Sequence, residues 1–280
     1  MTPVESAPSS TVSRASAAAP TQTASPALEL LLTARADHSP CPPVRELLVP
    51  PTAESAYAVQ LAWIERRLDE GAWVVGRKIG LTNPAVQAQL GVDSPDYGFL
   101  LADMSYDDGG VVPDGVLLQP RVEAEVAFVL RSDLDLANPT EHDVVAATDY
   151  VCAALEIVDS RIANWDIRLI DTIADNASAG AFVLGAERVA VTTDLADAAM
   201  AMTRNGELAS EGIGSDCMGS PLRAVAWLAR TCAALGSPLR AGEIVLSGAL
   251  GLVVDARPGD AFTARIEGLG SVSISFAASA

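Results

Sequence analysis

The chain has 280 residues, 50% of them apolar, which is enough for one large domain with a substantial buried core. Its 18 Lys and Arg residues are outnumbered by 36 Asp and Glu residues, so the formal net charge is -18 at pH 7. A surface with this charge repels phosphate backbones and anionic membranes, so neither nucleic acid nor a membrane is an expected partner. An anionic small substrate would have to be held by local cations or by a metal ion.

The cysteines and histidines narrow the chemistry further. The 4 cysteines are scattered and form no Cys-x-x-Cys pair, which indicates buried thiols in a reducing cytoplasm rather than a zinc or redox site. The two histidines are His38 and His142, and His38 lies in the loop-like stretch ADHSPCPP. Histidine-based acid–base catalysis is therefore disfavoured.

The first segments of the chain predict a tail and two helices. Residues 1–26 are rich in Ser, Ala, Pro and Thr, a composition typical of a disordered tail. Residues 26–37 and 52–71 carry apolar side chains at helical spacing around a Pro-rich link, which predicts a small helical N-terminal region over residues 27–71. Charges and glycines interrupt every stretch before the roughly 20 apolar residues of a membrane span, so we expect a soluble cytoplasmic protein.

A catalytic domain is expected over residues 72–280. Its first element, residues 72–81, has the composition of a strand, and residues 82–92 predict a short helix capped by Asn83. Lys78 therefore lies at the end of a strand and just before a helix. Such a position commonly faces a functional site, although a solvated lysine fits the sequence equally well.

The rest of this domain is predicted as short strands with a few helices. The segments are a strand at 120–130, a helix at 141–155, strands at 156–160 and 180–185, a turn at Asn205–Gly206, a helix at 220–236, and strands at 243–248, 261–267 and 271–276. Glycine and proline punctuate the strands, and the sequence lacks the long β-α-β alternation of a doubly wound fold. An α+β fold around a mixed or rolled sheet is therefore favoured.

The strand at 120–130, PRVEAEVAFVL, carries two acids in an otherwise apolar run. Side chains at i and i+2 of a strand share a face, so Glu123 and Glu125 project together while the apolar residues around them face the other side. A solvated face would accept both acids, whereas burial would demand a positive group between them. Glu156 begins another β-like segment, and three carboxylates form a hard-oxygen site suited to Mg²⁺ or Mn²⁺. The spacing leaves open whether Glu156 reaches the pair.

Four blocks of the sequence carry a family resemblance. They are GRKIGLTNPAVQAQLGVDSPDYGFLLADM (76–104), LLQPRVEAEVAFVL (117–130), ALEIVDSRIANWDIRLIDTIADNASAGAFVLG (154–185), and AGEIVLSGAL with PGDAFTARIEGLGSV near the C-terminus. On these blocks the chain resembles the 2-keto-4-pentenoate hydratases, also called 2-hydroxypenta-2,4-dienoate hydratases, of the fumarylacetoacetate hydrolase superfamily. The resemblance extends from about residue 27 to the C-terminus.

The resemblance implies a fold and a set of site residues. A small N-terminal region would precede a larger domain of mixed sheets rolled into a sandwich. A divalent metal ion, Mg²⁺ or Mn²⁺, would be held by Glu123, Glu125 and Glu156. Acid–base roles would fall to Lys78 and Asp96, and substrate binding to Arg77 and Ser178. The metal ion and Arg77 are expected to lower the pKa of Lys78 towards neutrality.

The resemblance also implies partners. The substrate would be a small anionic 2-oxo or 2-hydroxy acid. Family members are usually homo-oligomers, and a complex with another enzyme of the pathway is a further expectation.

The reaction implied is hydration of 2-hydroxypenta-2,4-dienoate to 4-hydroxy-2-oxopentanoate in the meta-cleavage degradation of aromatic compounds. Hydrolases of the superfamily use a Glu-His pair ahead of the metal site, and no histidine lies between His38 and His142, so hydrolysis is disfavoured. Three alternatives stay open: a 4-oxalocrotonate decarboxylase, a 2-oxohept-4-ene-1,7-dioate hydratase, and a non-catalytic partner subunit. The dioate would need an extra cation, for which Arg161 and Arg168 are candidates.

Overall fold

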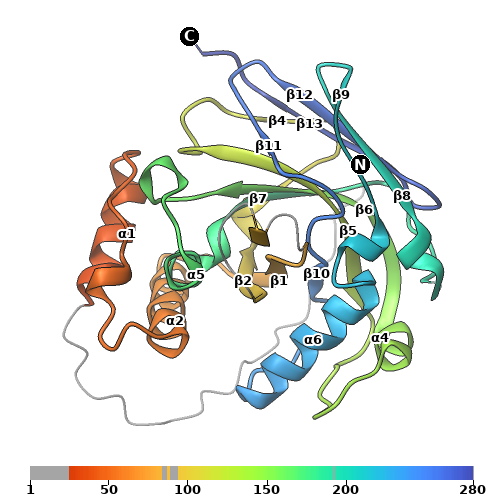
Figure 1. Ribbon diagram of the computed structural model, residues 1–280, viewed down its shortest axis with the longest axis horizontal. Coiled ribbons are helices and arrows are strands. Elements are labelled where there is room, and N and C mark those ends of the chain that lie inside the picture. Colours follow the sequence, from red (N-terminus) through yellow and green to blue (C-terminus); the bar gives the residue numbers. More distant parts are fainter. Residues whose placement is uncertain (1–24, 84–86, 89–93, 192, 280) are drawn as a thin grey trace, which may run out of the picture.

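The computed structural model describes residues 25–83, 87–88, 94–191 and 193–279. The predicted disordered tail lies outside the described residues except for its last two positions, and so does most of the helix predicted over residues 82–92. In Figure 1 the N-terminal helices stand on one side of a central sheet, and a second sheet lies over another part of it.

The described α-helices range from 6 to 17 residues in length. The α-helices are α1 (Pro26–Ala36), α2 (Ala53–Asp69), α4 (Glu141–Ala147), α5 (Leu169–Ala174) and α6 (Pro221–Ala234). The 3-10 helices are η1 (Arg45–Leu47), η2 (Ala102–Met104), η3 (Ala163–Trp165), η4 (Asn176–Ser178), η5 (Thr193–Asp197) and η6 (Gly214–Asp216). Both helices predicted in the N-terminal region, α1 and α2, are present.

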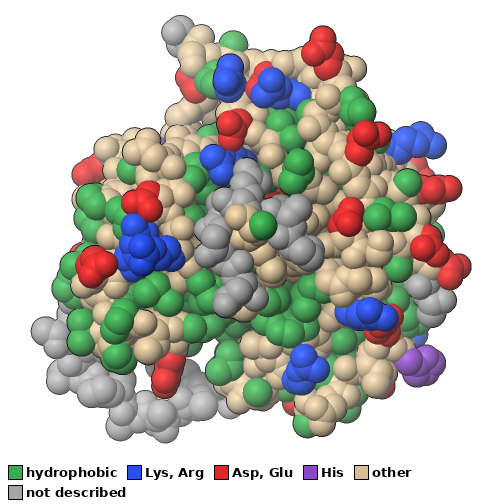
Figure 2. Space-filling model, in the orientation of Figure 1, with side chains coloured by type: hydrophobic (Ala, Val, Ile, Leu, Met, Phe, Trp, Pro, Cys, Tyr) green, Lys and Arg blue, Asp and Glu red, His purple; other side chains and the backbone are tan. Residues whose placement is uncertain are grey.

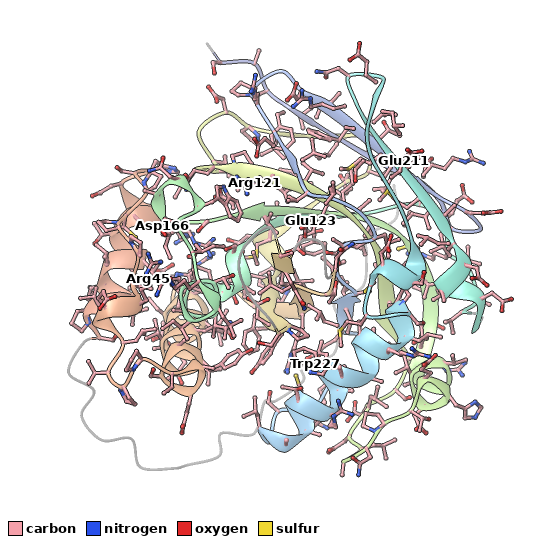
Figure 3. All side chains as sticks on the ribbon, in the orientation of Figure 1. Arg45, Arg121, Glu123, Asp166, Glu211 and Trp227 are labelled. Carbon is pink, nitrogen blue, oxygen red and sulfur yellow. The ribbon has the colours of Figure 1, made fainter. Side chains whose placement is uncertain are left out.

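The N-terminal helices are joined to the rest of the chain by charge and by packing. The Arg45 guanidinium donates to Asp171 Oδ2 of α5 at 2.7 Å and to Asp166 Oδ1 at 2.9 Å (Figure 3). Helix α2 contributes Trp63 and Ile64 to the core that the two sheets share. Because this core crosses the predicted boundary at residue 72, the division into two regions remains a prediction from sequence.

The larger sheet has eight strands in the described ranges, in the order β2-β1-β10-β5-β6-β7-β3, with β11 also paired to β5. Its strands are β1 (Val74–Gly80), β2 (Asp96–Leu101), β3 (Ser105–Tyr106), β5 (Pro120–Leu130), β6 (Thr148–Asp159), β7 (Ala179–Leu184), β10 (Ile244–Leu246) and β11 (Val254–Asp255). The pairs β1–β10 and β3–β7 are parallel, and the other pairs are antiparallel. The sheet is mixed, as predicted.

The smaller sheet has five strands in the same ranges, in the order β4-β13-β12-β8-β9. Its strands are β4 (Gly110–Val112), β8 (Ala199–Arg204), β9 (Glu207–Ile213), β12 (Ala261–Ile266) and β13 (Gly270–Phe276). Strand β13 lies against β6, and the apolar faces of the two sheets enclose a core that includes Val122, Ala153 and Val272. The predicted α+β class with mixed, packed sheets is confirmed.

One predicted helix is mostly a strand. The sequence predicts a helix over residues 141–155, but α4 ends at Ala147 and β6 begins at Thr148. Strand β6 is buried on both faces over most of its length. Because a strand buried on both faces is apolar throughout, the spacing of its apolar residues could not separate it from a buried helix.

Strand β5 turns one face to the core and the other to the acids. Val122, Ala124 and Val126 are at most 1% exposed and belong to the main core. The alternate residues, among them Glu123 and Glu125, project from the opposite face. Core packing on one side therefore fixes the direction of the acids on the other.

The outer surface agrees with the composition. Figure 2 shows acidic side chains spread over the visible face, with fewer basic side chains between them. Within the described ranges, no helix is both long enough and apolar enough to cross a membrane.

Candidate active site

The three acids predicted to bind a metal ion lie together. The antiparallel register of β5 and β6 sets Glu123 directly opposite Glu156, and Glu125 lies two pairs further along β5, opposite Ala154. Each acid offers a carboxylate oxygen within 4.8 Å of the other two. Glu125 and Glu156 are 0% exposed, and Glu123 is partly buried. The register thus settles what the spacing left open, because Glu156 reaches the pair.

These carboxylates have few positive or hydrogen-bonding groups around them, and the pKa values of Glu123 and Glu125 are raised. Burial and then the charge of Glu156 raise the pKa of Glu123 to about 7, and the same two causes raise the pKa of Glu125 well above its ordinary value. Glu125 Oε2 accepts a hydrogen bond from Gly248 N at 2.7 Å. Glu125 Oε1 and Glu156 Oε2 accept no hydrogen bond from any described residue, and Glu156 Oε1 has an ion pair with Lys78 Nζ at 3.1 Å. Buried carboxylate oxygens without donors are the ligands that a hard divalent cation takes, so the residues fit the predicted metal ion.

Lys78 extends from β1 into the acid cluster. Its Nζ lies 3.1 Å from Glu156 Oε1 and donates a hydrogen bond to Ala177 O at 2.9 Å. Burial acts to lower the pKa of Lys78, but the surrounding carboxylates, Glu156 first and then Asp96, raise it above its ordinary value. The side chains alone therefore raise this pKa, because acids surround Lys78 and Arg77 points away from it. The lowering expected beside a bound metal ion stays a prediction.

Arg77 lies outside the acid cluster. Neighbouring side chains of a strand point to opposite faces, so Arg77 and Lys78 diverge. Arg77 Nη1 donates to Ser237 O at 2.9 Å, and Nη2 donates to Ser237 Oγ at 3.0 Å. This position does not support the substrate-binding role expected for Arg77.

Asp96 faces the site from the first residue of β2. Its backbone pairs with Gly80, and its Oδ2 accepts a hydrogen bond from Thr172 Oγ1 at 3.1 Å. A Cβ added at Gly80 would lie 2.2 Å from Asp96 Oδ1 and 3.2 Å from Lys78 Nζ. Glycine at this position therefore leaves room for the two predicted acid–base groups to approach each other. Burial raises the pKa of Asp96, and the Lys78 charge opposes that rise.

Ser178 reaches the site on a tight turn. Asn176, Ala177 and Ser178 all have positive φ, at 53°, 50° and 53°. Asn176 holds the turn against β2, because its Nδ2 donates to Phe99 O at 3.0 Å and its Oδ1 accepts from Phe99 N at 2.8 Å. Ala177 O accepts the Lys78 hydrogen bond, so the turn positions both a backbone acceptor and the Ser178 hydroxyl.

A small cavity of about 40 Å³ lies among these groups. Its polar lining residues are Lys78, Asp96, Arg121, Glu123, Thr172 and Ser178. Its apolar lining residues include Val158, Trp165, Ile167 and Val253. Among the predicted site residues, Lys78, Asp96, Glu123 and Ser178 therefore share one cavity. Glu125 and Glu156 do not line it, but each has a carboxylate oxygen within 4.8 Å of one of Glu123.

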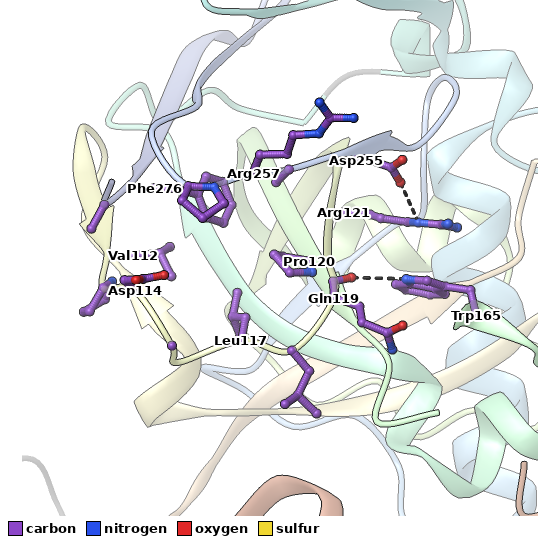
Figure 4. A pocket seen from close by; sticks show the side chains of 16 residues that line it. Val112, Asp114, Leu117, Gln119, Pro120, Arg121, Trp165, Asp255, Arg257 and Phe276 are labelled. Carbon is purple, nitrogen blue, oxygen red and sulfur yellow. Dashed lines mark hydrogen bonds and ion pairs between the residues drawn. The ribbon is translucent and has the colours of Figure 1, made fainter. Parts of the chain in front are cut away.

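Sequence reasoning missed three of the lining residues, Arg121, Trp165 and Thr172. Arg121 could have been predicted from strand alternation, since it stands two residues before Glu123 and shares its strand face. No sequence pattern pointed to Thr172 and Trp165, because they reach the cavity from separate short helices. A larger groove of about 490 Å³ opens beside the cavity, and Arg121 and Trp165 line both (Figure 4).

The two candidate cations for a distal carboxylate lie elsewhere. Arg161 is buried, pairs with the Asp175 carboxylate and donates to Ala179 O at 2.9 Å. Arg168 is exposed, and neither arginine lines the cavity or the groove. Arg161 instead binds both ends of the turn that carries Ser178, since it also donates to Asp175 O.

Comparison with known proteins places the chain in a family. A family model described as fumarylacetoacetate (FAA) hydrolase C-terminal matches residues 87–276. The 2-keto-4-pentenoate hydratase of Paraburkholderia xenovorans (strain LB400) is 50% identical over 251 residues, which is 89% of this chain and 93% of that protein. The 2-keto-4-pentenoate hydratase 2 of Dechloromonas aromatica (strain RCB) is 52% identical over 252 residues, which is 90% of this chain and 96% of that protein.

Solved structures agree with the sequence matches. The 4-oxalocrotonate decarboxylase from Pseudomonas putida G7, complexed with magnesium and adipate, has a TM-score of 0.83 and 36% sequence identity to this chain. The match covers 89% of this chain and 97% of that one. The predicted fold and the resemblance are both confirmed. This chain belongs to the 2-keto-4-pentenoate hydratase family of the fumarylacetoacetate hydrolase superfamily.

Proposed function

We propose that this chain is a hydro-lyase that hydrates 2-hydroxypenta-2,4-dienoate (2-keto-4-pentenoate) to 4-hydroxy-2-oxopentanoate in the meta-cleavage degradation of aromatic compounds. The observation that carries the proposal is the buried cluster of three acids beside Lys78 and Asp96. Relatives at about half identity support it by name, including the TodF product hydratase of Pseudomonas putida F1, which is 52% identical over 236 residues.

The metal ion is proposed as Mg²⁺ or Mn²⁺. Glu123, Glu125 and Glu156 would hold it, and an all-carboxylate ligand set favours hard cations. The solved 4-oxalocrotonate decarboxylase is known in complexes with magnesium and with calcium, which supports a divalent ion in a chain of this family. Such an ion would act as a Lewis acid that stabilises negative charge on the 2-oxygen of the substrate.

The chain's own residues would move the protons. A proton leaves the 2-hydroxyl of the dienol and another reaches C5, which gives an α,β-unsaturated ketone. Water then adds with its oxygen at C4 and a proton at C3. Lys78 Nζ is the proton donor closest to the acid cluster, and Asp96 Oδ1 accepts no hydrogen bond from a described residue, so it is available to orient and deprotonate the water.

The remaining lining residues would orient the substrate and exclude bulk water. The hydroxyls of Thr172 and Ser178 lie 3.4 Å apart and face the same cavity as Asp96. The Ser178 hydroxyl is proposed to donate a hydrogen bond to the substrate. Val158, Ile167 and Val253 supply an apolar wall for the carbon chain.

The alternatives have less support. The decarboxylase neighbour is 36% identical, whereas the hydratases are 50–52% identical over similar lengths. Neither Arg161 nor Arg168, the candidate cations for the second carboxylate of a 1,7-dioate substrate, lines the cavity. A non-catalytic partner subunit would not require Lys78 and Asp96 to be buried beside three acids.

The purified protein can be assayed with Mg²⁺ on two substrates in parallel. Loss of the dienol absorbance of 2-hydroxypenta-2,4-dienoate supports the hydratase, whereas CO₂ release from 4-oxalocrotonate without dienol loss supports the decarboxylase. The variant E123Q should lose metal-dependent turnover and keep its fold by circular dichroism. Full activity of E123Q in the presence of a chelator would exclude the metal assignment.

Self-association and a cytoplasmic location are also proposed. Leu61 and Leu68 of α2 are 47% and 43% exposed and stand seven residues apart, so they share a helix face, and Trp73 just beyond α2 is 64% exposed. An apolar surface of this kind supports contact with a second copy of the chain. Light scattering coupled to size exclusion would give the number of copies, and a monomer at assay concentration would contradict the proposal.

A further inference from the structure

Arg121 stands at the boundary between the cavity and the groove. It lies on β5 two residues before Glu123, so both side chains project from the same face of the strand (Figure 3). Lys78 and Asp96 line the cavity and not the groove, whereas Arg121 lines both. A molecule that passes from the groove to the acid cluster therefore passes this guanidinium.

The guanidinium is held in place and still has free donors. Its central carbon lies 4.3 Å from the centroid of the Trp165 ring, and its Nε lies 2.8 Å from Asp255 Oδ1. The Trp165 ring is itself fixed, because its Nε1 donates to Gln119 O at 3.1 Å (Figure 4). The two terminal nitrogens of Arg121 donate no hydrogen bond to any described residue. Two adjacent N–H donors on one edge of a fixed planar cation match the geometry of a carboxylate.

The charges of the cavity call for such a cation. Glu123, Glu125, Glu156 and Asp96 outnumber Lys78, and a divalent ion would not offset all of their charge. Lys78 is already paired with Glu156. Among the described lining residues, Arg121 is the cation left to attract an anion, and its ion-pair partner Asp255 is 65% exposed and therefore screened by solvent.

The positions of the reacting groups fix the direction of the substrate. If Lys78 and Asp96 act on C3 to C5, the other end of the molecule points away from them, towards Arg121. We propose that Arg121 is a substrate-binding residue that takes the C1 carboxylate of the 2-hydroxydienoate on its two terminal nitrogens and so orients the carbon chain. This inference rests on the proposed function, which supplies the position of the carboxylate.

The variants R121M and R121K test the proposal against one control. R257M removes the other arginine of the groove, which does not line the cavity. For R121M we expect a KM for the dienoate that is about 10- to 100-fold higher, with a much smaller change in kcat, since a charge-assisted hydrogen bond to the substrate is lost. R121K should fall between R121M and the wild type, because a lysine offers a point charge without the fork.

Binding of an unreactive analogue gives a readout that does not depend on turnover. Calorimetry on the Mg²⁺-loaded protein compares 2-oxopentanoate with its neutral amide. The wild type and R257M should prefer the acid strongly, and R121M should lose about tenfold or more of that preference while its Mg²⁺ affinity and melting temperature stay near wild type. An unchanged preference in R121M, or an equal loss in R257M, overturns the proposal.

The binding assay also tests the carboxylate site at Arg121 separately from the proposed reaction. A wild type that binds 2-oxopentanoate through Arg121 but leaves the dienoate unchanged would exclude the proposed reaction and retain the carboxylate site. If the wild type hydrates the dienoate and R121M is unchanged in both assays, the proposed reaction is retained and the carboxylate site at Arg121 is excluded. If R121M unfolds, R121G can be tested with added guanidinium-type cations in its place. Recovery of 2-oxopentanoate binding would then support the proposal, and no recovery would contradict it.

Discussion

Lys78 Nζ and Glu156 Oε1 lie 3.1 Å apart, and both side chains are at most 2% exposed. Removing one member of a buried ion pair leaves the other charge unpaired, at a cost of about 3–5 kcal/mol. We predict that K78M lowers the free energy of unfolding of the metal-free protein by about this amount and lowers kcat by at least about 100-fold, because a proton donor is lost. Urea unfolding and steady-state kinetics measure the two effects.

The double variant K78M/E156Q separates stability from catalysis. It removes both charges of the pair, so it should regain most of the stability of the wild type and none of the activity. Normal kcat in K78M would contradict the acid–base role of Lys78.

Glu125 tests the metal site through stability. In E125Q the amide oxygen can still accept from Gly248 N, but the acid cluster loses one negative charge. Because the acids repel one another, metal-free E125Q should melt at a higher temperature than the metal-free wild type. The stabilisation by Mg²⁺, about 2.7 kcal/mol at a hundred times Kd for a single site, should be lost.

Calorimetry with and without Mg²⁺ measures both effects, and E211Q is the matched control because Glu211 is exposed on β9 (Figure 3). E211Q should behave like the wild type in both conditions. Equal stabilisation of E125Q and wild type by Mg²⁺ would place the metal ion elsewhere.

The buried carboxyl group of Asp175 should make the free energy of unfolding depend on pH. Burial raises the pKa of Asp175 to about 6 from its ordinary 3.8, and pairing with Arg161 opposes that rise. Between about pH 4 and 6 the folded protein therefore binds a proton that the unfolded chain does not, so the stability from this group increases as the pH falls. Relative to D175N, the wild type should gain stability from pH 7 down to 4 in urea unfolding. A difference that stays constant with pH would show that Asp175 does not titrate in this range.

A side chain at position 80 should lower activity by steric displacement of Asp96. A Cβ at this position would lie 2.2 Å from Asp96 Oδ1, so G80A must displace the carboxylate. We expect kcat/KM to fall by about 10- to 100-fold, since misplacing a reacting group by about 1 Å has effects of this size. The Mg²⁺ affinity should change much less, because the atoms nearest to the added Cβ belong to Asp96 and Lys78 and not to the ligand acids. A fully active G80A would argue against Asp96 as the group that handles water.

The sequence predicted that Glu123 and Glu125 share a face and named Glu156 as a third acid, but it left open whether Glu156 reaches the pair. Strand periodicity put the first two on one face, and only the register of β5 against β6 brings Glu156 opposite Glu123. Register depends on side-chain packing along both strands, which a single sequence does not display. The family resemblance implied that Glu156 joins the pair, which the local pattern left open.

Two expectations differ from the structure, one drawn from periodicity and one from the family resemblance. Residues 148–155 look helical because β6 is buried on both faces, so its apolar residues show no alternation. Arg77 was expected in the site beside Lys78, although adjacent residues of one strand face opposite ways. The same rule applied to Arg121 and Glu123 would have placed Arg121 at the site from sequence alone.

The two faces of β5 give this strand two separable kinds of mutational effect. Arg121, Glu123 and Glu125 project towards the groove and the acid cluster, whereas Val122, Ala124 and Val126 pack in the core. In a saturation screen that scores cellular abundance and catalytic output independently, scores from residue 121 to residue 126 should therefore alternate with a period of two. Substitutions at the even positions of this stretch would lower the amount of protein, and those at the odd positions would leave it abundant but inactive.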